Sequence, residues 1–226
     1  MKKNALIYVS LTILCLLMTS FDQVKKKKII FFGDSITQMG VQPGGYIQQL
    51  GELAKKHKRE ADFDLIGKGI GGNKVYDLYL RLEDDVLNLS PDVVFIYIGI
   101  NDIWHKQGSG TGTDIDKYEL FYQTLIRKMK AKNIQVVLCT PTVIGERYDN
   151  TNEQDKELNQ YSDVIRKLAA DNGLKLVDLR TSFLTYLKKN NTANLEKDIL
   201  TTDRVHLNAK GNGLVADEMW KVISAL

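Results

Sequence analysis

Residues 28–37 read KIIFFGDSIT, and the fold class can be argued from how this kind of segment recurs along the chain. Its apolar part, Ile29–Phe32, is short and uninterrupted, which is typical of a β-strand covered on both faces of a sheet. The turn residues Gly33-Asp34-Ser35 follow it at once. The segment therefore predicts a buried strand that ends in a tight turn carrying polar side chains.

Four more apolar runs of strand length follow: Phe63–Ile66, Val93–Ile98, Val136–Cys139 and Leu174–Val177. Segments with apolar residues three or four positions apart, the spacing of a helix, alternate with them. They are Tyr46–Lys56, Val75–Leu87, Asp116–Lys130, a fourth segment marked by Leu158, Tyr161, Ile165 and Leu168 that ends at Asn172-Gly173, and a last one marked by Val215, Met219, Val222 and Leu226. This alternation predicts an α/β fold with a five-stranded parallel sheet, right-handed crossovers and helices on both faces.

The composition is that of an ordinary globular protein, with 43% hydrophobic and 26% charged residues among 226. It excludes a disordered, a collagen-like or a disulfide-framework protein. The net charge of +3 is a small surplus without the clustered basic face of a nucleic-acid binder, so no nucleic-acid partner is expected. No repeat or linker divides the chain after its N-terminal segment, and we expect one domain over residues 29–226.

The first residues have the pattern of a secretory signal peptide. Lys2 and Lys3 precede an apolar run, Ala5–Met18, and the small residues Thr19-Ser20 close it. We expect a signal peptide over residues 1–20, a basic leader over residues 21–28, and export to the periplasm or the cell exterior without stable membrane insertion. An uncleaved N-terminal membrane anchor is the alternative, although the apolar run is shorter than the roughly 20 residues of a spanning helix.

The two cysteines fall on either side of the predicted cleavage point. Cys15 also allows lipoprotein processing, but Leu14 stands where a lipoprotein signal has a small residue. Cleavage after Ser20 leaves Cys139 as the remaining cysteine, so we expect no internal disulfide. Because Cys139 ends an apolar strand, we expect it to be a small buried hydrophobic residue.

Polar and glycine residues gather directly after the predicted strands. In a parallel α/β sheet the active site lies beyond the carboxyl ends of the strands, so these residues are expected at one edge. They are Gly33-Asp34-Ser35-Ile36-Thr37, Gly69-Ile70-Gly71-Gly72-Asn73, Gly99-Ile100-Asn101-Asp102 and Thr140-Pro141-Thr142. A further polar group, Asp203-Arg204-Val205-His206, precedes the last helix.

These residue types fit acyl transfer, which needs a nucleophile, a base, a group that orients the base, and donors for an oxyanion. Ser35 on a tight turn is the candidate nucleophile, and His206 is the candidate base. Asp203, three residues before His206, can reach the imidazole across a short turn. The N–H groups of Ser35 and Gly72 and the side-chain amide of Asn101 are the candidate oxyanion donors.

With these motifs the chain resembles the SGNH/GDSL family of hydrolases over essentially its whole length after the leader. The matching blocks are Gly33-Asp34-Ser35, Gly72, Gly99-Ile100-Asn101-Asp102 and Asp203–His206, the last continued by Leu207, Asn208 and Gly211. The family name has Leu where this chain has Ile36. The resemblance implies a flavodoxin-like three-layer α/β/α sandwich, the SGNH hydrolase fold, and ester hydrolysis without a metal or cofactor.

The resemblance also implies the site residues: a catalytic triad of Ser35, Asp203 and His206, with Ser35, Gly72 and Asn101 forming the oxyanion hole. The second block leaves the choice between Gly71 and Gly72 open, and Gly72 is favoured because the residue after it is an asparagine, as in the family. The segment Gly67–Gly72 also matches the G-x-G-x-x-G pattern of dinucleotide binding. It follows the second strand, however, and the next strand does not end in an acidic residue, so we expect no nucleotide cofactor.

The function that follows is a serine esterase that forms an acyl-enzyme on Ser35. Short acyl groups are expected, such as acetyl on a carbohydrate or a small alcohol, with a glycan or small-molecule ester as the partner. A lysophospholipase or thioesterase acting on longer acyl chains is the alternative for the same site. A non-catalytic carbohydrate-binding module is a remote alternative from another class.

Two polar loops, Gly108–Thr113 and Thr142–Asn152, are expected at the same edge, where they would shape the substrate cleft. The first is expected either as a flexible rim over the cleft or as a plain solvated connection. His105 lies shortly before the first loop and is expected either at the cleft rim or in a plain surface loop. Asp34 is expected to hold the turn before Ser35, and Asp102 to brace the loop that carries Asn101.

Overall fold

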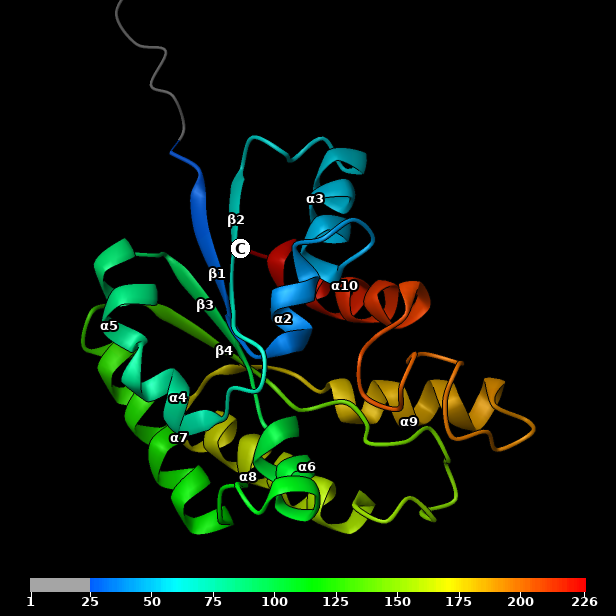
Figure 1. The fold of residues 1–226 in the computed structure, drawn as a ribbon. Helices are drawn as coiled ribbons and strands as arrows, with labels where there is room; N and C mark the ends of the chain where they lie inside the picture. Colours follow the sequence, from blue (N-terminus) through cyan, green and yellow to red (C-terminus); the bar gives the residue numbers. More distant parts are fainter. Residues whose placement is uncertain (1–24) are drawn as a thin grey trace, which may run out of the picture.

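The computed structural model describes residues 25–226, whose ribbon is drawn in Figure 1. Five parallel strands form one sheet in the order β2-β1-β3-β4-β5. The strands are β1 (Lys27–Gly33), β2 (Phe63–Gly69), β3 (Val93–Tyr97), β4 (Gln135–Cys139) and β5 (Lys175–Val177). This is the flavodoxin-like order, so the predicted α/β fold class is confirmed. The predicted signal peptide, and the leader as far as residue 24, lie outside the described residues.

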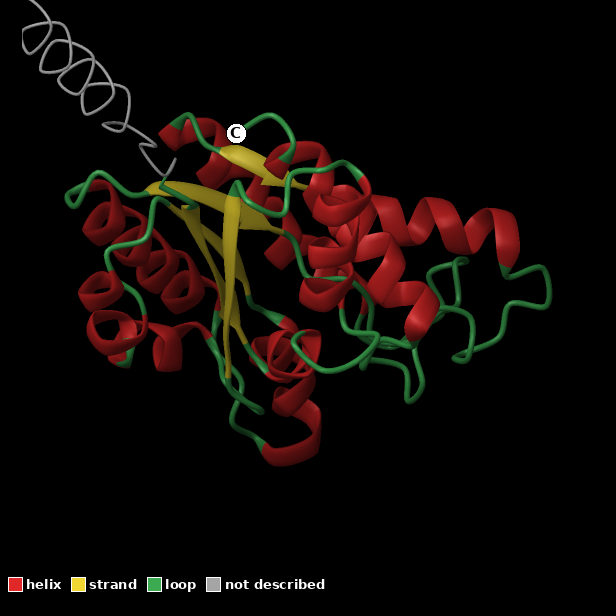
Figure 2. Ribbon diagram, turned by 90° about the horizontal axis from the view of Figure 1, so that it is seen from above, coloured by secondary structure: helices red, strands yellow, loops and turns green. Residues whose placement is uncertain are grey.

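Helices cover both faces of this sheet, as Figures 1 and 2 show. They are α2 (Ser35–Gly40), α3 (Tyr46–Lys56), α4 (Val75–Leu80), α5 (Leu82–Asp85), α6 (Ile100–Ser109), α7 (Ile115–Lys130), α8 (Asp155–Asn172), α9 (Leu179–Asn190) and α10 (Ala209–Ile223). On one face α3 and α9 pack against α10, and on the other α4 and α8 pack against α7. Within residues 25–226, none of these helices is both long and apolar enough to cross a membrane.

The strands that read as uninterrupted apolar runs are the buried centre of the sheet. Ile29–Phe32 in β1 is fully buried, and so is nearly all of Val93–Tyr97 in β3. Both strands have a neighbour on each side and helices above and below, which explains why neither alternates apolar with polar residues. Cys139, at the end of β4, is buried with a free thiol, and burial raises its pKa.

The carboxyl ends of four strands are aligned. Gly33 at the end of β1 pairs with Gly69 of β2 and with Tyr97 of β3. Tyr97 pairs in turn with Cys139 at the end of β4. The polar segments that follow these strands therefore leave the sheet at one common edge.

Three helical predictions need correction. The helix predicted over Val75–Leu87 is interrupted at Arg81, whose backbone leaves the helical region (φ −105°, ψ 9°), and it continues as α5 and a 3₁₀ turn, Leu87–Leu89. Helices α6 and α9 were not anticipated, and α6 takes in the first two residues of the predicted loop Gly108–Thr113. The last predicted helix, marked by Val215, Met219, Val222 and Leu226, begins at Ala209, where the Asn208 side chain caps it.

Candidate active site

Ser35 is the first residue of α2 and follows β1 through a turn that leaves little room for side chains. A Cβ at Gly33 would lie 2.4 Å from both the Thr37 hydroxyl and the Tyr97 carbonyl oxygen, so glycine is required there by space. The Asp34 carboxylate caps the helix by accepting the Ile36 N–H at 3.0 Å. This strand–turn–helix geometry holds Ser35 at the sheet edge.

The structure brings Ser35, His206 and Asp203 together in one hydrogen-bonded chain. Ser35 Oγ lies 3.0 Å from His206 Nε2, and His206 Nδ1 lies 2.6 Å from Asp203 Oδ2. Because an ionised carboxylate only accepts, it favours the tautomer with the proton on Nδ1 and leaves Nε2 free to accept from the serine hydroxyl. The arrangement is a hydroxyl with a base in contact and an acid that orients the base.

The Asp203 carboxylate is fixed by the same short turn that carries the histidine. Its Oδ1 accepts the backbone N–H groups of Val205 at 3.1 Å and His206 at 2.7 Å. Partial burial opposes the charge of Asp203, but the hydrogen bonds from the His206 ring and these two N–H groups outweigh it and lower its pKa. Asp203 is therefore an anion that can stabilise a positive imidazolium.

Two further carboxyl groups are buried close to the hydrogen-bonded series of Ser35, His206 and Asp203. Burial raises the pKa of Asp34 to about 7, against the lowering effect of the Ile36 N–H. Burial likewise raises the pKa of Asp102 to about 6, although both its oxygens accept the Val75 N–H, at 3.2 and 3.3 Å. The edge of the sheet thus holds one stabilised anion and two carboxyl groups whose ionisation is opposed by burial.

Gly71 and Gly72 differ in what their N–H groups do. The Gly71 N–H donates to the Gln38 side chain at 2.8 Å, and a Cβ at Gly71 would lie 3.9 Å from Ser35 Cβ. The Gly72 N–H has no acceptor within residues 25–226, and its positive φ of 76° suits glycine. The loop after β2 therefore brings Gly71 close to Ser35 and carries, one residue further on, an N–H without an acceptor in this part of the chain.

Asn101, near the start of α6, is hydrogen-bonded to the same loop. Its Nδ2 donates to the Asn73 carbonyl at 3.1 Å, and its side chain is almost fully buried. A primary amide has two N–H donors, so one remains after this bond. The next residue, Asp102, accepts the backbone N–H of Val75, which lies two residues after Asn73. Together the contacts of Asn101 and Asp102 join the start of α6 to the segment after Gly72.

Two aromatic side chains from α6 border the site. The Trp104 ring lies 6.3 Å from the His206 ring, edge to face, and His105 Cε1 lies 3.9 Å from the position of a Cβ on Gly72. Burial lowers the pKa of His105, and the charge of Lys74 lowers it further. His105 therefore lies at the rim of the site, the first of the two places considered for it.

Arg81 is a site residue that the sequence interpretation missed. Its guanidinium lies over the Phe32 ring and donates to the Gly33 carbonyl and to Asn73 Oδ1, both at 2.7 Å. It thus joins the end of β1, directly before the turn that carries Ser35, to the loop after β2. The sequence did hold one indication of this role: Arg81 is a charged residue three positions after Leu78, which is buried, so it falls on the apolar face of the predicted helix.

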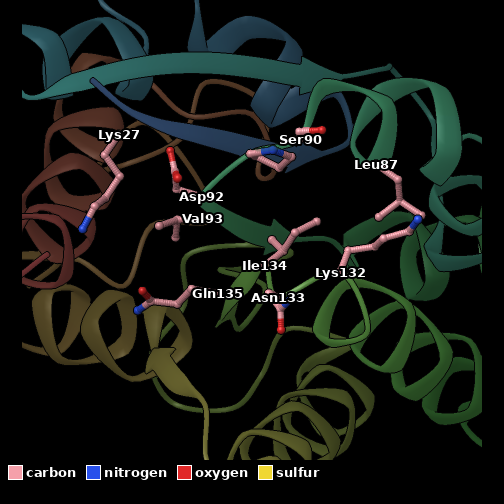
Figure 3. A pocket seen from close by; sticks show the side chains of 10 residues that line it. Lys27, Leu87, Ser90, Asp92, Val93, Lys132, Asn133, Ile134 and Gln135 are labelled. Carbon is pink, nitrogen blue, oxygen red and sulfur yellow. The ribbon is translucent and has the colours of Figure 1, made fainter. Parts of the chain in front are cut away.

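A cavity of about 520 Å³ lies elsewhere, at the amino ends of the strands (Figure 3). It is bordered by Ser90, Asp92 and Val93 before and within β3, and by Asn133 and Gln135 at the start of β4. None of the predicted site residues lines it. Within residues 25–226 no three His, Cys, Asp or Glu side chains gather where they could hold a metal ion.

Comparison with known proteins identifies the family. The pattern of the GDSL-like Lipase/Acylhydrolase family matches residues 31–214, which is most of the chain. The protein belongs to the GDSL-like lipase/acylhydrolase family. It is therefore an enzyme that hydrolyses ester bonds, and the resemblance found from the motifs is confirmed.

Several esterases resemble this family member over most of their length. The crystal structure of an acetyl xylan esterase, AlAXEase, is 58% identical with a TM-score of 0.86, covering 87% of this chain and 99% of that one. The acetylxylan esterase of Geobacillus stearothermophilus is 31% identical, covering 84% of this chain and 90% of the relative. The human isoamyl acetate-hydrolyzing esterase 1 homolog is 24% identical, covering 87% and 81%.

Proposed function

We propose that this GDSL-family esterase removes acetyl groups from xylan-type carbohydrates through an acyl-enzyme on Ser35. The observation that supports it most directly is the chain Ser35–His206–Asp203, with contacts of 3.0 and 2.6 Å at the carboxyl edge of the sheet. The carbohydrate substrate class rests on the two acetylxylan esterases that the chain resembles.

The reaction follows from this geometry. Ser35 Oγ attacks the ester carbonyl carbon while His206 Nε2 takes the hydroxyl proton, and Asp203 stabilises the imidazolium that forms. The N–H groups of Ser35 and Gly72 and the Asn101 amide hold the oxyanion. As the tetrahedral intermediate collapses, His206 returns the proton to the sugar oxygen that leaves. Water then attacks the acetyl-serine with His206 again as base, releasing acetate and free Ser35.

We assign the second oxyanion donor to Gly72 instead of Gly71. The Gly71 N–H is already bound to Gln38, whereas the Gly72 N–H has no acceptor within residues 25–226. A donor already in use would have to break that bond to stabilise the oxyanion, which would offset its contribution.

Acetate release from acetylated xylo-oligosaccharides and hydrolysis of 4-nitrophenyl esters of increasing length test this function. We expect acetate to be released, acetyl esters to be preferred over octanoyl esters, and Ser35→Ala to abolish both activities. A preference for long acyl chains would indicate the lysophospholipase or thioesterase alternative. Glycan binding without hydrolysis would indicate the non-catalytic module, and full activity of Ser35→Ala would overturn the mechanism.

We also propose that the enzyme is exported. The support is the signal pattern of residues 1–20, and polymeric xylan outside the cell is a substrate that an exported enzyme can reach. The mass of the protein recovered from expressing cells checks this: cleavage after Ser20 gives a chain that begins at Phe21. A full-length chain retained in the membrane fraction would instead indicate the N-terminal anchor.

A further inference from the structure

Glu146, in the loop between β4 and α8, is a fully buried carboxylate outside the catalytic chain. It accepts three successive backbone N–H groups, from Ile199 at 2.8 Å, Leu200 at 2.7 Å and Thr201. No cationic side chain within residues 25–226 pairs with it. Burying a carboxylate costs free energy unless its oxygens are hydrogen-bonded. The three N–H groups of residues 199–201 supply these bonds, so Glu146 is tied to that segment.

The segment it holds is one arm of the hairpin that carries the catalytic acid and base. Thr201 and Leu207 form an antiparallel bridge. The Thr202 N–H donates to the His206 carbonyl at 2.8 Å, and the Asn208 N–H donates to the Leu200 carbonyl at 2.9 Å. Fixing residues 199–201 therefore fixes the arm of the hairpin that lies opposite the arm with His206.

The tip of the hairpin is held by the residue next to Glu146. The Gly145 N–H donates to the Arg204 carbonyl at 2.9 Å. Arg204, between Asp203 and His206, has a φ of 82°, which a residue with a side chain adopts only at a cost in free energy. The hairpin therefore needs outside contacts to keep this turn, and the loop of Gly145 and Glu146 supplies them.

We propose that Glu146 is a positioning residue for ester hydrolysis. It holds residues 199–201 so that the Asp203–His206 turn presents its imidazole to Ser35. Glu146 acts through this hairpin and does not touch the substrate. The proposal rests on the roles assigned above to Asp203 and His206.

A carboxylate suits this position better than an amide. Its two oxygens only accept, and all three facing groups are N–H donors. Glu146→Gln keeps the shape but turns an NH₂ group toward at least one of these donors. The hairpin then loses part of its anchor while the substrate-contacting residues stay unchanged.

The test is a double-mutant cycle in the full chain, with 4-nitrophenyl acetate as substrate. Glu146→Gln is expected to lower kcat by about 10- to 100-fold with KM changed by less than about 3-fold, because a small displacement of a catalytic group has this effect. In the Asp203→Ala background the same change should lower kcat by less than about 3-fold, since the geometry it protects is already lost. A purely structural role would reduce activity by the same factor in both backgrounds.

Asp92→Asn is the matched control. Asp92 is a carboxylate at the opposite sheet edge that accepts the backbone N–H of Lys28 at 2.7 Å, so it undergoes the same chemical change far from the hairpin. Its kcat should equal that of the wild type. If Glu146→Gln does not fold, the cycle is run with Glu146→Asp, which keeps the charge but draws it back by one methylene.

Equal losses in both backgrounds, or an unchanged kcat in a folded Glu146 variant, would overturn the positioning role. These results leave the proposed mechanism intact as long as Ser35→Ala and Asp203→Ala remain impaired. Wild-type activity in Asp203→Ala would instead overturn the proposed mechanism itself, and the role of Glu146 with it.

Discussion

In the proposed mechanism, Asn101 is a side chain that is held in place before the transition state forms. One of its amide N–H groups is bound to the Asn73 carbonyl at 3.1 Å, and the side chain is buried. This bond fixes the amide plane before substrate arrives, so the second N–H needs no reorganisation to meet an oxyanion. The same contact joins the loop that carries Gly72 to the start of α6, so the two proposed oxyanion donors are tied to each other.

Asn101→Ala should therefore lower kcat by roughly 100- to 1,000-fold with a small change in KM, the usual loss for one oxyanion donor. Steady-state kinetics on 4-nitrophenyl acetate measures this. Asn88→Ala, the same change at an exposed asparagine in the 3₁₀ turn after α5, should leave kcat unchanged. A loss of only a few-fold in Asn101→Ala would remove Asn101 from the oxyanion hole.

Among the single residues of the site, the sequence predicted those whose partner is close in the chain and those that directly follow a strand. Asp203 and His206 are three positions apart, and Ser35 follows β1 directly. The proposed choice of Gly72 over Gly71 draws on the structure, because it depends on the Gln38 side chain from α2, which accepts the Gly71 N–H. Glu146 was missed for the same reason, since its acceptors face a segment more than fifty positions away.

Among the helices, α10 is the one that directly follows the hairpin with Asp203 and His206. It begins at Ala209, shortly after His206, and Asn208 caps it by accepting the N–H groups of Lys210 and Gly211, both at 3.0 Å. The sequence placed this helix directly after Asp203–His206 but marked it only from Val215 on, because Gly211 and Gly213 interrupt the apolar spacing of its first turns. Helix α9 was missed although Leu179, Phe183 and Leu187 recur at helical spacing, because it follows the three-residue β5 at once.

Asn208→Ala should lower the free energy of unfolding by about 1 kcal/mol, because two N–H groups at the start of α10 lose their acceptor. Asn208→Asp keeps an acceptor of the same length and adds a charge that the helix N-terminus favours, so it should retain wild-type stability. Urea unfolding of both variants measures the difference. Equal destabilisation of the two would show that the cap does not stabilise the helix.

For the molecule as a whole, the sheet edge that assembles the site is also where buried carboxyl groups oppose stability. Asp34 and Asp102 follow β1 and β3, and their burial is a consequence of bringing four strand ends together. The alternation of strands and helices predicted this common edge from the sequence. It did not predict how deeply the two carboxyl groups are buried, since burial depends on the packing of α2, α4 and α6 over the strand ends.

The sign of the resulting pH dependence follows from Asp34. Its pKa is about 7 in the folded protein, against an ordinary value of 3.8. Between these values the folded protein keeps a proton that the unfolded chain has released, so stability falls as pH rises from about 4 to about 7 and stays level above that. Asp34→Asn keeps an oxygen for the Ile36 N–H and removes this titration. At pH 8 the variant should gain on the order of 2–4 kcal/mol relative to its difference from wild type at pH 4.

Urea unfolding at several pH values between 4 and 8 measures this gain, with Asp64→Asn, the same change at an exposed carboxyl on β2, as the control. The wild-type and Asp64→Asn curves should fall together, while the Asp34→Asn curve should fall less. The other groups with shifted pKa values, among them Asp102, His105 and Asp203, are present in all three proteins and contribute to all three curves. Parallel curves for Asp34→Asn and the wild type would show that the Asp34 carboxyl ionises in the folded protein without opposing its stability.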